Sequence, residues 1–409
     1  MIEVIDRPED VGLCRDRLGR ITDHLQRRYL GPGHLPGAQV VVARGGQVAW
    51  HDCLGQRDVE AAAPVTADTV YRIYSMTKPL TSVALLSLYE EGRFQLDDPV
   101  SRFLPSWADL RVWEDGDHLK YRTCFPEREM TVRDLLTHTS GLTYGFMARH
   151  PLDALYRHRG VERTEPGNTL EKMVETLSTL PLLFSPGTRW SYSVATDVCG
   201  RLCEVLTGQP FDDVLRQRVL DPLDMADTGF QVRPDQVGRL ASNYAATPEG
   251  GLALVDAPAT STYLAAPTFL SGGGGLVSTA RDYLRFATML AAGGVLDGVR
   301  VLGRRTVDYL ATNHLPTGGD LASMGQRVFS ETTYEGIGFG LGVSVVIDPA
   351  RTQVLCSPGE FGWGGAASTV FWVDPVEDLV VVALTQLMPS STYPIRRELR
   401  TLVYQALVA

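Results

Sequence analysis

The chain has 409 residues, of which 44% are hydrophobic, and carries a formal net charge of −10 at neutral pH. This length and apolar content suffice for a large buried core, which we expect to divide into two lobes. A net negative charge offers no general attraction for nucleic acid, so no nucleic-acid partner is expected. No apolar run reaches the length of a membrane span and the first ten residues lack a secretory pattern, so we expect a cytoplasmic protein with no membrane partner.

The usual patterns of metal and cofactor sites are missing from the sequence. The six cysteines are scattered, as is usual in a reducing compartment, and Cys199 and Cys203 have the spacing of one buried helical face. None of the eight histidines belongs to an H-E-x-x-H motif, and we expect His138 to make structural hydrogen bonds. The glycines at 272–275 lack the endings of phosphate and dinucleotide loops, so we expect a flexible or close-packed loop beside the site. The sequence implies no cofactor and no metal.

The predicted elements begin with an N-terminal helix and a β-hairpin. Strand-like residues 38–44 and 47–51 flank two adjacent glycines, which favour a two-residue turn. A buried helix is expected after Ser75, because residues 80–88 are apolar on nearly every side. From about residue 96 to 270, helical patterns interrupted by proline and glycine predominate, with few clear strands.

Beyond residue 270 the chain is expected to return to the sheet. A helix at 279–292 leads to strand-like segments at 340–347, 368–373 and 379–384, and a last helix follows near 393–408. We therefore predict an α+β fold in which residues 1–95 and 271–409 form one discontinuous lobe, an antiparallel sheet flanked by helices. Residues 96–270 would form a mainly helical lobe, with the active site in the cleft between the two lobes.

The most informative motif is S-x-x-K at residues 75–78. Residues three apart are neighbours on a helix, so the Ser75 hydroxyl and the Lys78 amine can converge. A serine hydroxyl is a weak nucleophile that needs a base, and a lysine can be that base when burial or a nearby cation disfavours its protonation. Taken alone, the motif occurs by chance in many proteins and is usually a helix cap followed by a solvated lysine.

Two further motifs make this pattern more specific. The tripeptides YSV at 192–194 and WGG at 363–365 follow in the order and approximate spacing seen in serine β-lactamases and penicillin-binding proteins. The runs 138–142, 272–279 and 362–375 add to the similarity. Over nearly its whole length the chain resembles the family VIII carboxylesterases, the esterase branch of the class C β-lactamase-like serine hydrolases. The resemblance implies the β-lactamase and penicillin-binding-protein fold.

The resemblance also implies a role for each motif. Ser75 matches the family's nucleophile, Lys78 its partner base, and Tyr192 the tyrosine that carries protons to and from the leaving group. Lys78 and Tyr192 would act together as one base. The oxyanion donors would be the backbone amides of Ser75 and Ala366, since two adjacent glycines let a strand edge approach a ligand closely.

Two departures from the lactamase pattern bear on the substrate. Trp363 stands where lactamases and penicillin-binding proteins usually have a lysine, and Val194 stands where lactamases have an asparagine. Loss of a cation and an amide leaves a less polar pocket, which suits an apolar acyl ester better than an anionic lactam. The candidate substrate-binding residues are Trp363, Gly364, Gly365, Tyr144 and Phe146.

The predicted function is hydrolysis of short- to medium-chain carboxylic esters through a Ser75 acyl-enzyme, with a small-molecule ester as the substrate. Transfer of the acyl group to a small-molecule acceptor uses the same residues and is the nearest alternative. A β-lactamase or D-amino-acid peptidase is disfavoured by Trp363 and Val194. A catalytically inactive binding protein is disfavoured by the intact catalytic residues. The physiological substrate and the oligomeric state are left open.

Overall fold

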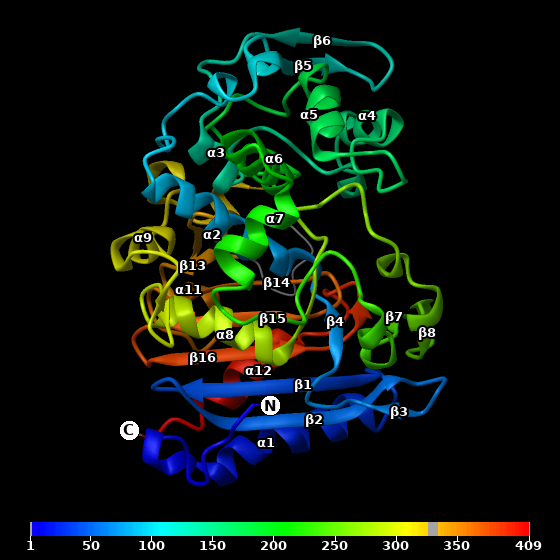
Figure 1. Cartoon of the computed structure of the whole chain (residues 1–409), viewed down its shortest axis with the longest axis vertical. Coiled ribbons are helices and arrows are strands. Elements are labelled where there is room, and N and C mark those ends of the chain that lie inside the picture. Colours follow the sequence, from blue (N-terminus) through cyan, green and yellow to red (C-terminus); the bar gives the residue numbers. More distant parts are fainter. Residues whose placement is uncertain (1, 326–333, 409) are drawn as a thin grey trace.

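A computed structural model describes residues 2–325 and 334–408 of the chain (Figure 1). Within these residues the largest sheet has eight strands, and every neighbouring pair is antiparallel. The predicted α+β class is confirmed. In spatial order the strands are β12 (Ile337–Phe339), β13 (Ser344–Val346), β14 (Phe361–Gly364), β15 (Val370–Asp374), β16 (Leu379–Leu384), β1 (Gly37–Arg44), β2 (Gln47–Asp58) and β3 (Ala63–Pro64).

The N-terminal and C-terminal parts of the chain meet inside this sheet. β1 pairs with β16, from Gln39 opposite Leu384 to Arg44 opposite Leu379. On its other side β1 pairs with β2 through the predicted hairpin, whose turn is made by two adjacent glycines at positive φ. Glycine adopts such φ values without steric cost, so the pair supplies the two-residue turn that the sequence predicts.

Helices cover both faces of the central strands (Figure 1). α1 (Arg15–Leu25) and α12 (Ile395–Tyr404) lie on one face, and α8 (Ala280–Ala291) lies on the other. Side chains along β1 alternate between the two cores, with Val40 packed on the α1 and α12 side and Val41 on the α8 side. A strand that is buried on both faces has no polar side, which is why β1 is a nearly continuous apolar run.

One predicted strand is wrong in its extent. The segment 340–347 was expected to be strand-like throughout, whereas the structure has β12 and β13 joined by a tight turn. The Gly340 N–H donates to the Val343 carbonyl at 2.8 Å, and Gly342 has a φ of 96°. Only glycine adopts that φ easily, so the chain reverses within the segment.

A largely helical group of elements lies above the sheet in Figure 1, with α2 between the two. Every residue of α2 from Thr77 to Leu86 is buried, as the sequence predicts for this helix. The cysteines at 199 and 203 are buried on α6, which packs against α2. The helices are α2 (Thr77–Glu90), α3 (Val132–Leu136), α4 (Pro151–Arg159), α5 (Leu170–Ser178), α6 (Ala195–Thr207) and α7 (Phe211–Leu215).

Small sheets and short helices complete the described residues. One hairpin is β5 (Val112–Gly116) with β6 (Tyr121–Cys124), and another is β7 (Asn243–Ala246) with β8 (Leu252–Asp256), extended by a parallel β17 (Leu387–Met388). The others are β4 (Val70–Arg72), β9 (Val277–Thr279), β10 (Val295–Leu296), β11 (Val299–Arg300), α9 (Arg304–Leu310), α10 (Leu321–Met324) and α11 (Pro349–Thr352).

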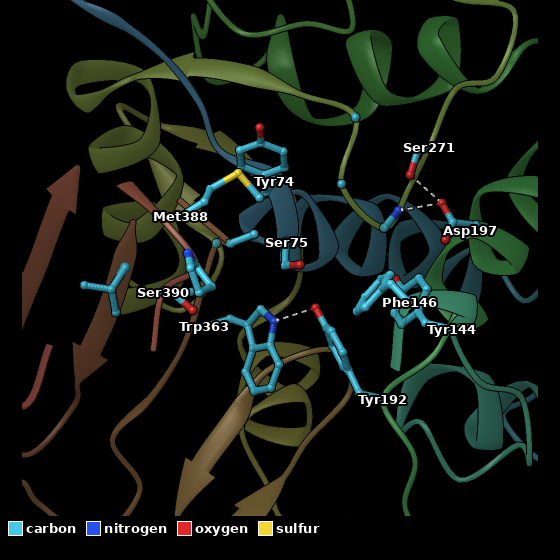
Figure 2. Close-up of a pocket in the computed structure, with 18 of the residues that line it drawn as sticks. Tyr74, Ser75, Tyr144, Phe146, Tyr192, Asp197, Ser271, Trp363, Met388 and Ser390 are labelled. Carbon is cyan, nitrogen blue, oxygen red and sulfur yellow. Dashed lines mark hydrogen bonds between the residues drawn. The ribbon is translucent and has the colours of Figure 1, made fainter. Parts of the chain in front are cut away.

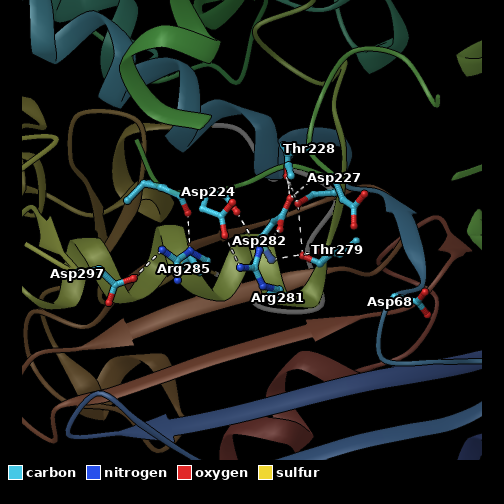
Figure 3. Close-up of polar contacts among 12 residues, drawn as sticks. Asp68, Asp224, Asp227, Thr228, Thr279, Arg281, Asp282, Arg285 and Asp297 are labelled. Carbon is cyan, nitrogen blue, oxygen red and sulfur yellow. Dashed lines mark hydrogen bonds and ion pairs between the residues drawn. The ribbon is translucent and has the colours of Figure 1, made fainter. Parts of the chain in front are cut away.

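A polar cluster, here called the α8 cluster, joins the start of α8 to the loop that precedes β7 (Figure 3). The buried Asp282 carboxylate accepts the Asp227 N–H at 2.8 Å and the Thr228 hydroxyl at 2.9 Å. Thr279 ends β9 and caps α8 by accepting the Asp282 N–H at 3.2 Å. β9 pairs with β4, and β4 leads into the segment that carries Ser75. The hydrogen bonds of the α8 cluster therefore stabilise the pair of strands from which this segment starts.

Candidate active site

Ser75 lies in a single 3₁₀ turn, Tyr74–Met76, that leads directly into α2. Tyr74 has a φ of 43°, a left-handed conformation that a bulky residue adopts only when its surroundings hold it there. Its hydroxyl accepts a hydrogen bond from the Asn243 side-chain amide at 3.0 Å. Upstream, the Ile73 N–H donates to a backbone carbonyl at 3.1 Å. This strained turn presents Ser75 to a large cavity (Figure 2).

Lys78 lies one helical turn after Ser75 and is 1% exposed. Its Nζ is 3.4 Å from Ser75 Oγ and 2.6 Å from the carbonyl oxygen of Gly273. The same nitrogen lies 4.5 Å from the centre of the Tyr192 ring. The structure therefore brings the predicted nucleophile and the two members of the predicted base together.

Tyr192 belongs to an extended segment just before α6. The Ser191 N–H donates to the His138 carbonyl at 2.9 Å, which anchors this segment to the residues after α3. The Tyr192 hydroxyl accepts the indole N–H of Trp363 at 3.4 Å (Figure 2). Segments around residues 75, 192 and 363, far apart in the sequence, thus meet at one end of the cavity.

The third motif lies where β14 ends. A Cβ on Gly365 would clash with the carbonyl oxygen of Ile73 and with Oγ1 of Thr369, so only glycine fits at this position. The close approach places the backbone of Ala366 beside the turn that carries Ser75, and both residues line the cavity. The two amides predicted as oxyanion donors therefore border the same space.

The glycine run at 272–275 is a close-packed loop rather than an open one. A Cβ on Gly272 would stand 2.8 Å from the Thr196 carbonyl oxygen, and a Cβ on Gly273 would stand 2.6 Å from Asp197 Oδ2. The Gly272 carbonyl also accepts the Thr81 hydroxyl at 2.8 Å. Because no side chain fits at these two positions, the backbone itself can reach Lys78.

Asp197 is a site residue that the sequence analysis missed. Its carboxylate accepts the Ser271 hydroxyl at 2.6 Å and the Gly273 N–H at 3.0 Å (Figure 2). Burial raises the pKa of Asp197, and the positive charge of Lys78 opposes that rise. Since the Gly273 carbonyl accepts from Lys78, one glycine links the carboxylate to the amine.

His138 makes a structural contact beside the site. Its Nδ1 lies 3.1 Å from the Ser193 hydroxyl, and its ring centre is 5.1 Å from that of Tyr192. Burial holds the pKa of His138 well below its ordinary value, and the Lys78 charge acts in the same direction. A neutral imidazole therefore packs against the Tyr192 ring.

The cavity has a volume of about 1130 Å³. Tyr144 and Phe146 both line it, as expected of aromatic lining, and their rings stack with centres 4.6 Å apart. Glu162 also lines it and accepts the Gly145 N–H at 2.5 Å. Burial raises the pKa of Glu162 to about 7. Small-molecule sites commonly occupy about 300 to 1,000 Å³, so this cavity leaves room for both parts of an ester.

Residues 2–325 and 334–408 lack two further kinds of feature. No group of three or more histidine, cysteine, aspartate or glutamate side chains there is arranged to hold a metal ion. In the same ranges no helix is both long and apolar enough to cross a bilayer.

Comparison with known proteins adds to this geometry. The family model described as Beta-lactamase matches residues 22–405. The chain belongs to the β-lactamase family. Protein Rv1367c of Mycobacterium tuberculosis strain H37Rv is 37% identical over 368 residues, which cover 89% of this chain and 88% of that protein. Esterase EstB of Burkholderia gladioli is 31% identical over 413 residues, with 97% and 96% covered.

A solved structure extends the match to three dimensions. EstCE1, described as a hydrolase with promiscuous acyltransferase activity, superposes with a TM-score of 0.81 at 27% identity and covers 95% of this chain and 99% of its own. The fold is thus that of the β-lactamases and penicillin-binding proteins. Together with EstB, this structure confirms the resemblance to the family VIII carboxylesterases. The chain is a member of a serine hydrolase superfamily.

Proposed function

We propose that this protein is a serine carboxylesterase that hydrolyses short- to medium-chain carboxylic esters through an acyl-enzyme. The observation that carries the proposal is the convergence of Ser75, Lys78 and Tyr192 at the wall of the cavity, which Ser75 and Tyr192 line and behind which Lys78 is buried. The similarity to EstB over almost the full length of both chains supports it.

In the proposed first step, Ser75 Oγ attacks the ester carbonyl carbon while the Lys78 and Tyr192 pair accepts the hydroxyl proton. Negative charge develops on the carbonyl oxygen, where the N–H groups of Ser75 and Ala366 would stabilise it. The tetrahedral intermediate then collapses, and the alcohol leaves with a proton delivered by Tyr192. This step forms the Ser75 ester and breaks the substrate's bond to the alcohol.

In the proposed second step a water molecule attacks the acyl carbon of the Ser75 ester. The same pair accepts a proton from the water, and the same two amides stabilise the second tetrahedral intermediate. Collapse releases the carboxylic acid and returns the proton to Ser75. Buried Trp363 and Val194, 8% and 1% exposed, line this end of the cavity and favour an apolar acyl group.

The test is hydrolysis of p-nitrophenyl acetate, butyrate and octanoate by the wild type and by Ser75→Ala, with intact mass spectrometry of the wild type during turnover. We expect the wild type to turn over and to carry one acyl adduct, and Ser75→Ala to show neither. Ser87→Ala is the matched control, because Ser87 lies on α2, the helix that follows Ser75, and its hydroxyl bonds to the Ala84 carbonyl and to Arg218 away from the cavity. Full activity in Ser75→Ala would contradict the proposal.

Acyl transfer to an alcohol or amine is the second candidate, favoured by the likeness to EstCE1 and by a cavity large enough for an acceptor. The two activities share the acyl-enzyme and differ in what attacks it. Product analysis with added butanol separates them. Mostly butyl ester at modest butanol concentration would establish a transferase, whereas mostly free acid would establish an esterase.

A further inference from the structure

The predicted oxyanion donor at Ala366 belongs to the peptide unit that joins it to Gly365. The carbonyl oxygen of this unit, that of Gly365, accepts a hydrogen bond from Arg396 Nη2 at 2.5 Å. The same nitrogen donates to the Thr369 carbonyl at 3.0 Å. Arg396 projects from α12, borders the same cavity as Gly365 and Ala366, and holds both ends of the turn that follows β14.

Planarity of the peptide bond couples this carbonyl to the oxyanion donor. In a trans peptide the C=O and the N–H point in opposite directions from a rigid plane. A donor that fixes the direction of the Gly365 carbonyl therefore fixes the direction of the Ala366 N–H. The Ser368 N–H also reaches the Gly365 carbonyl, at 3.2 Å, but Arg396 supplies the shorter bond and the charge.

The guanidinium also changes the strength of the donor. A hydrogen bond from a cation is shorter and stronger than one from a neutral group. When a carbonyl accepts such a bond, the whole peptide is polarised and its N–H becomes a better donor, because hydrogen bonds in a chain reinforce one another. The bond from Arg396 should therefore strengthen the interaction of Ala366 with a developing oxyanion.

The local sequence makes room for this contact. A Cβ on Gly364 would stand 2.7 Å from Arg396 Cζ and 2.8 Å from its Nη2. The guanidinium reaches the Gly365 carbonyl only because residue 364 has no side chain. The two glycines of the third motif thus have different tasks: Gly365 admits the Ile73 backbone, and Gly364 admits Arg396.

We propose that Arg396 is a positioning residue that orients and polarises the Gly365–Ala366 peptide for stabilisation of the oxyanion. The proposal rests on the proposed function, because it requires an acyl-enzyme at Ser75. It assigns a role in the reaction to α12, an element that contributes none of the predicted catalytic side chains.

The test compares Arg396→Ala and Arg396→Lys with the matched control Arg17→Ala. Arg17 lies on α1, where its guanidinium also donates to a backbone carbonyl, that of Gln405, at 2.7 Å, and it does not line the cavity. Removing a direct oxyanion donor costs 10²- to 10³-fold, so for Arg396→Ala we expect an indirect loss of about 10- to 100-fold in kcat with KM nearly unchanged. Arg396→Lys should lose less, and Arg17→Ala should retain wild-type kcat.

Two further readouts separate positioning from a merely structural role. Infrared difference spectra of the acyl-enzyme should show the ester carbonyl stretch at a higher frequency in Arg396→Ala than in the wild type, because a weaker oxyanion site polarises that carbonyl less. Millimolar guanidinium should restore part of the lost kcat in Arg396→Ala and change nothing in Arg17→Ala.

Gly364→Ala is an independent variant that keeps Arg396 but displaces its guanidinium, and it should show the same loss of kcat and the same infrared shift. If Arg396→Ala does not fold, Gly364→Ala and Arg396→Lys decide the question. A folded Arg396→Ala with wild-type kcat and carbonyl frequency would overturn the inference while leaving the Ser75 mechanism intact. An Arg396→Ala variant that loses thermal stability but keeps wild-type kcat and carbonyl frequency would overturn the inference as well. Esterase activity that survives Ser75→Ala would instead refute the proposed function itself.

Discussion

Two buried polar clusters of this molecule differ in how completely their hydrogen bonds are made. In the α8 cluster, Asp282 accepts donors at 2.8 and 2.9 Å and also lies 3.3 Å from Arg281 (Figure 3). In the candidate site, Lys78 is 3.4 Å from Ser75 and Tyr192 receives the Trp363 indole at 3.4 Å (Figure 2). The α8 cluster uses its polar groups to hold the fold, whereas the site keeps its reactive oxygens weakly bonded and ready for a substrate.

The backbone shows the same contrast. Thr279 caps α8 from ordinary extended φ and ψ angles, while Tyr74, beside the candidate nucleophile, is held at a φ of 43°. Strained backbone and long hydrogen bonds cost stability, and proteins retain them mainly where function requires them. Mutations in the two clusters should therefore separate catalysis from stability.

The largest effect should come from Lys78→Met, which tests whether the site contributes to activity at the expense of stability. We expect kcat to fall about 10³- to 10⁴-fold, because the variant loses half of the base. The free energy of unfolding should change little, since the relief of burying a cation is offset by the loss of the 2.6 Å hydrogen bond to the Gly273 carbonyl. Ester hydrolysis and urea unfolding measure the two quantities. Lys172→Met, at an exposed lysine, is the control. A kcat within tenfold of wild type in Lys78→Met would contradict the contrast drawn between the candidate site and the α8 cluster.

Tyr192→Phe should lower kcat about 10²- to 10³-fold, because the variant keeps the ring but has no hydroxyl to carry the leaving group's proton. Stability should change by less than about 1 kcal/mol, since the only hydrogen bond recorded for this hydroxyl among the described residues is the 3.4 Å contact from Trp363. Stopped-flow hydrolysis and thermal unfolding test both parts. A large loss of stability would show that the hydroxyl serves the fold, as Asp282 does.

The opposite behaviour is expected of Asp282→Ala. This change removes the buried acceptor of the Asp227 N–H and leaves the Thr228 hydroxyl with its contact to the Ser278 hydroxyl, so the free energy of unfolding should fall by about 3 kcal/mol. The kcat of the remaining folded protein should be unchanged. Asp297→Ala is the control, because Asp297 is exposed and its ion pair with Arg285 at 2.7 Å should contribute less than about 1 kcal/mol. Urea unfolding of both variants gives the measurement.

The last predicted effect is a pH-dependent change in the free energy of unfolding, caused by a residue of the cavity wall. Burial raises the pKa of Glu162 to about 7 from an ordinary value of 4.5, so the folded state favours the protonated form. Its contribution to stability is present below about pH 4.5 and is lost as the pH rises to about 7. Glu162→Gln, which stays neutral, should be more stable than wild type by about 3 kcal/mol at pH 8 and nearly equal to it at pH 4.5. Equal stabilities of wild type and Glu162→Gln at pH 8 would show that ionised Glu162 does not destabilise the fold.

Local spacing is enough to predict that Ser75 and Lys78 meet, because both lie within one helical turn. Tyr192 and Trp363 carry no such local signal, and only the order of the three motifs and the family resemblance single them out. The sequence did not allow Asp197 or Arg396 to be predicted as site residues. Asp197 acts on Ser271 and Gly273, which follow it by 74 and 76 residues, and such pairings are set by the tertiary fold.

The fold was predicted best where burial sets the pattern. The central strands and α2 are apolar on both sides, so their sequence leaves little choice of structure. The hairpin of β5 and β6 was missed because its strands lie among helical patterns and are partly exposed, although Asp115 and Gly116 form a turn signal within it. The turn within residues 340–347 was missed because a glycine in a strand-like pattern is compatible with either a bend or a reversal of the chain.

The pairing of β1 with β16 has a consequence for biosynthesis. The Thr385 side chain, just after β16, bonds to the carbonyl of Gly37, which lies 348 residues earlier in the chain. At translation rates of 5 to 20 residues per second, β1 must wait roughly 20 to 70 seconds for its partner to leave the ribosome. Throughout that time the strongly apolar strand β1 has one unpaired edge. We expect the nascent chain to depend on holdase chaperones, and short translational pauses before β16 to increase the yield of aggregate more than pauses after it.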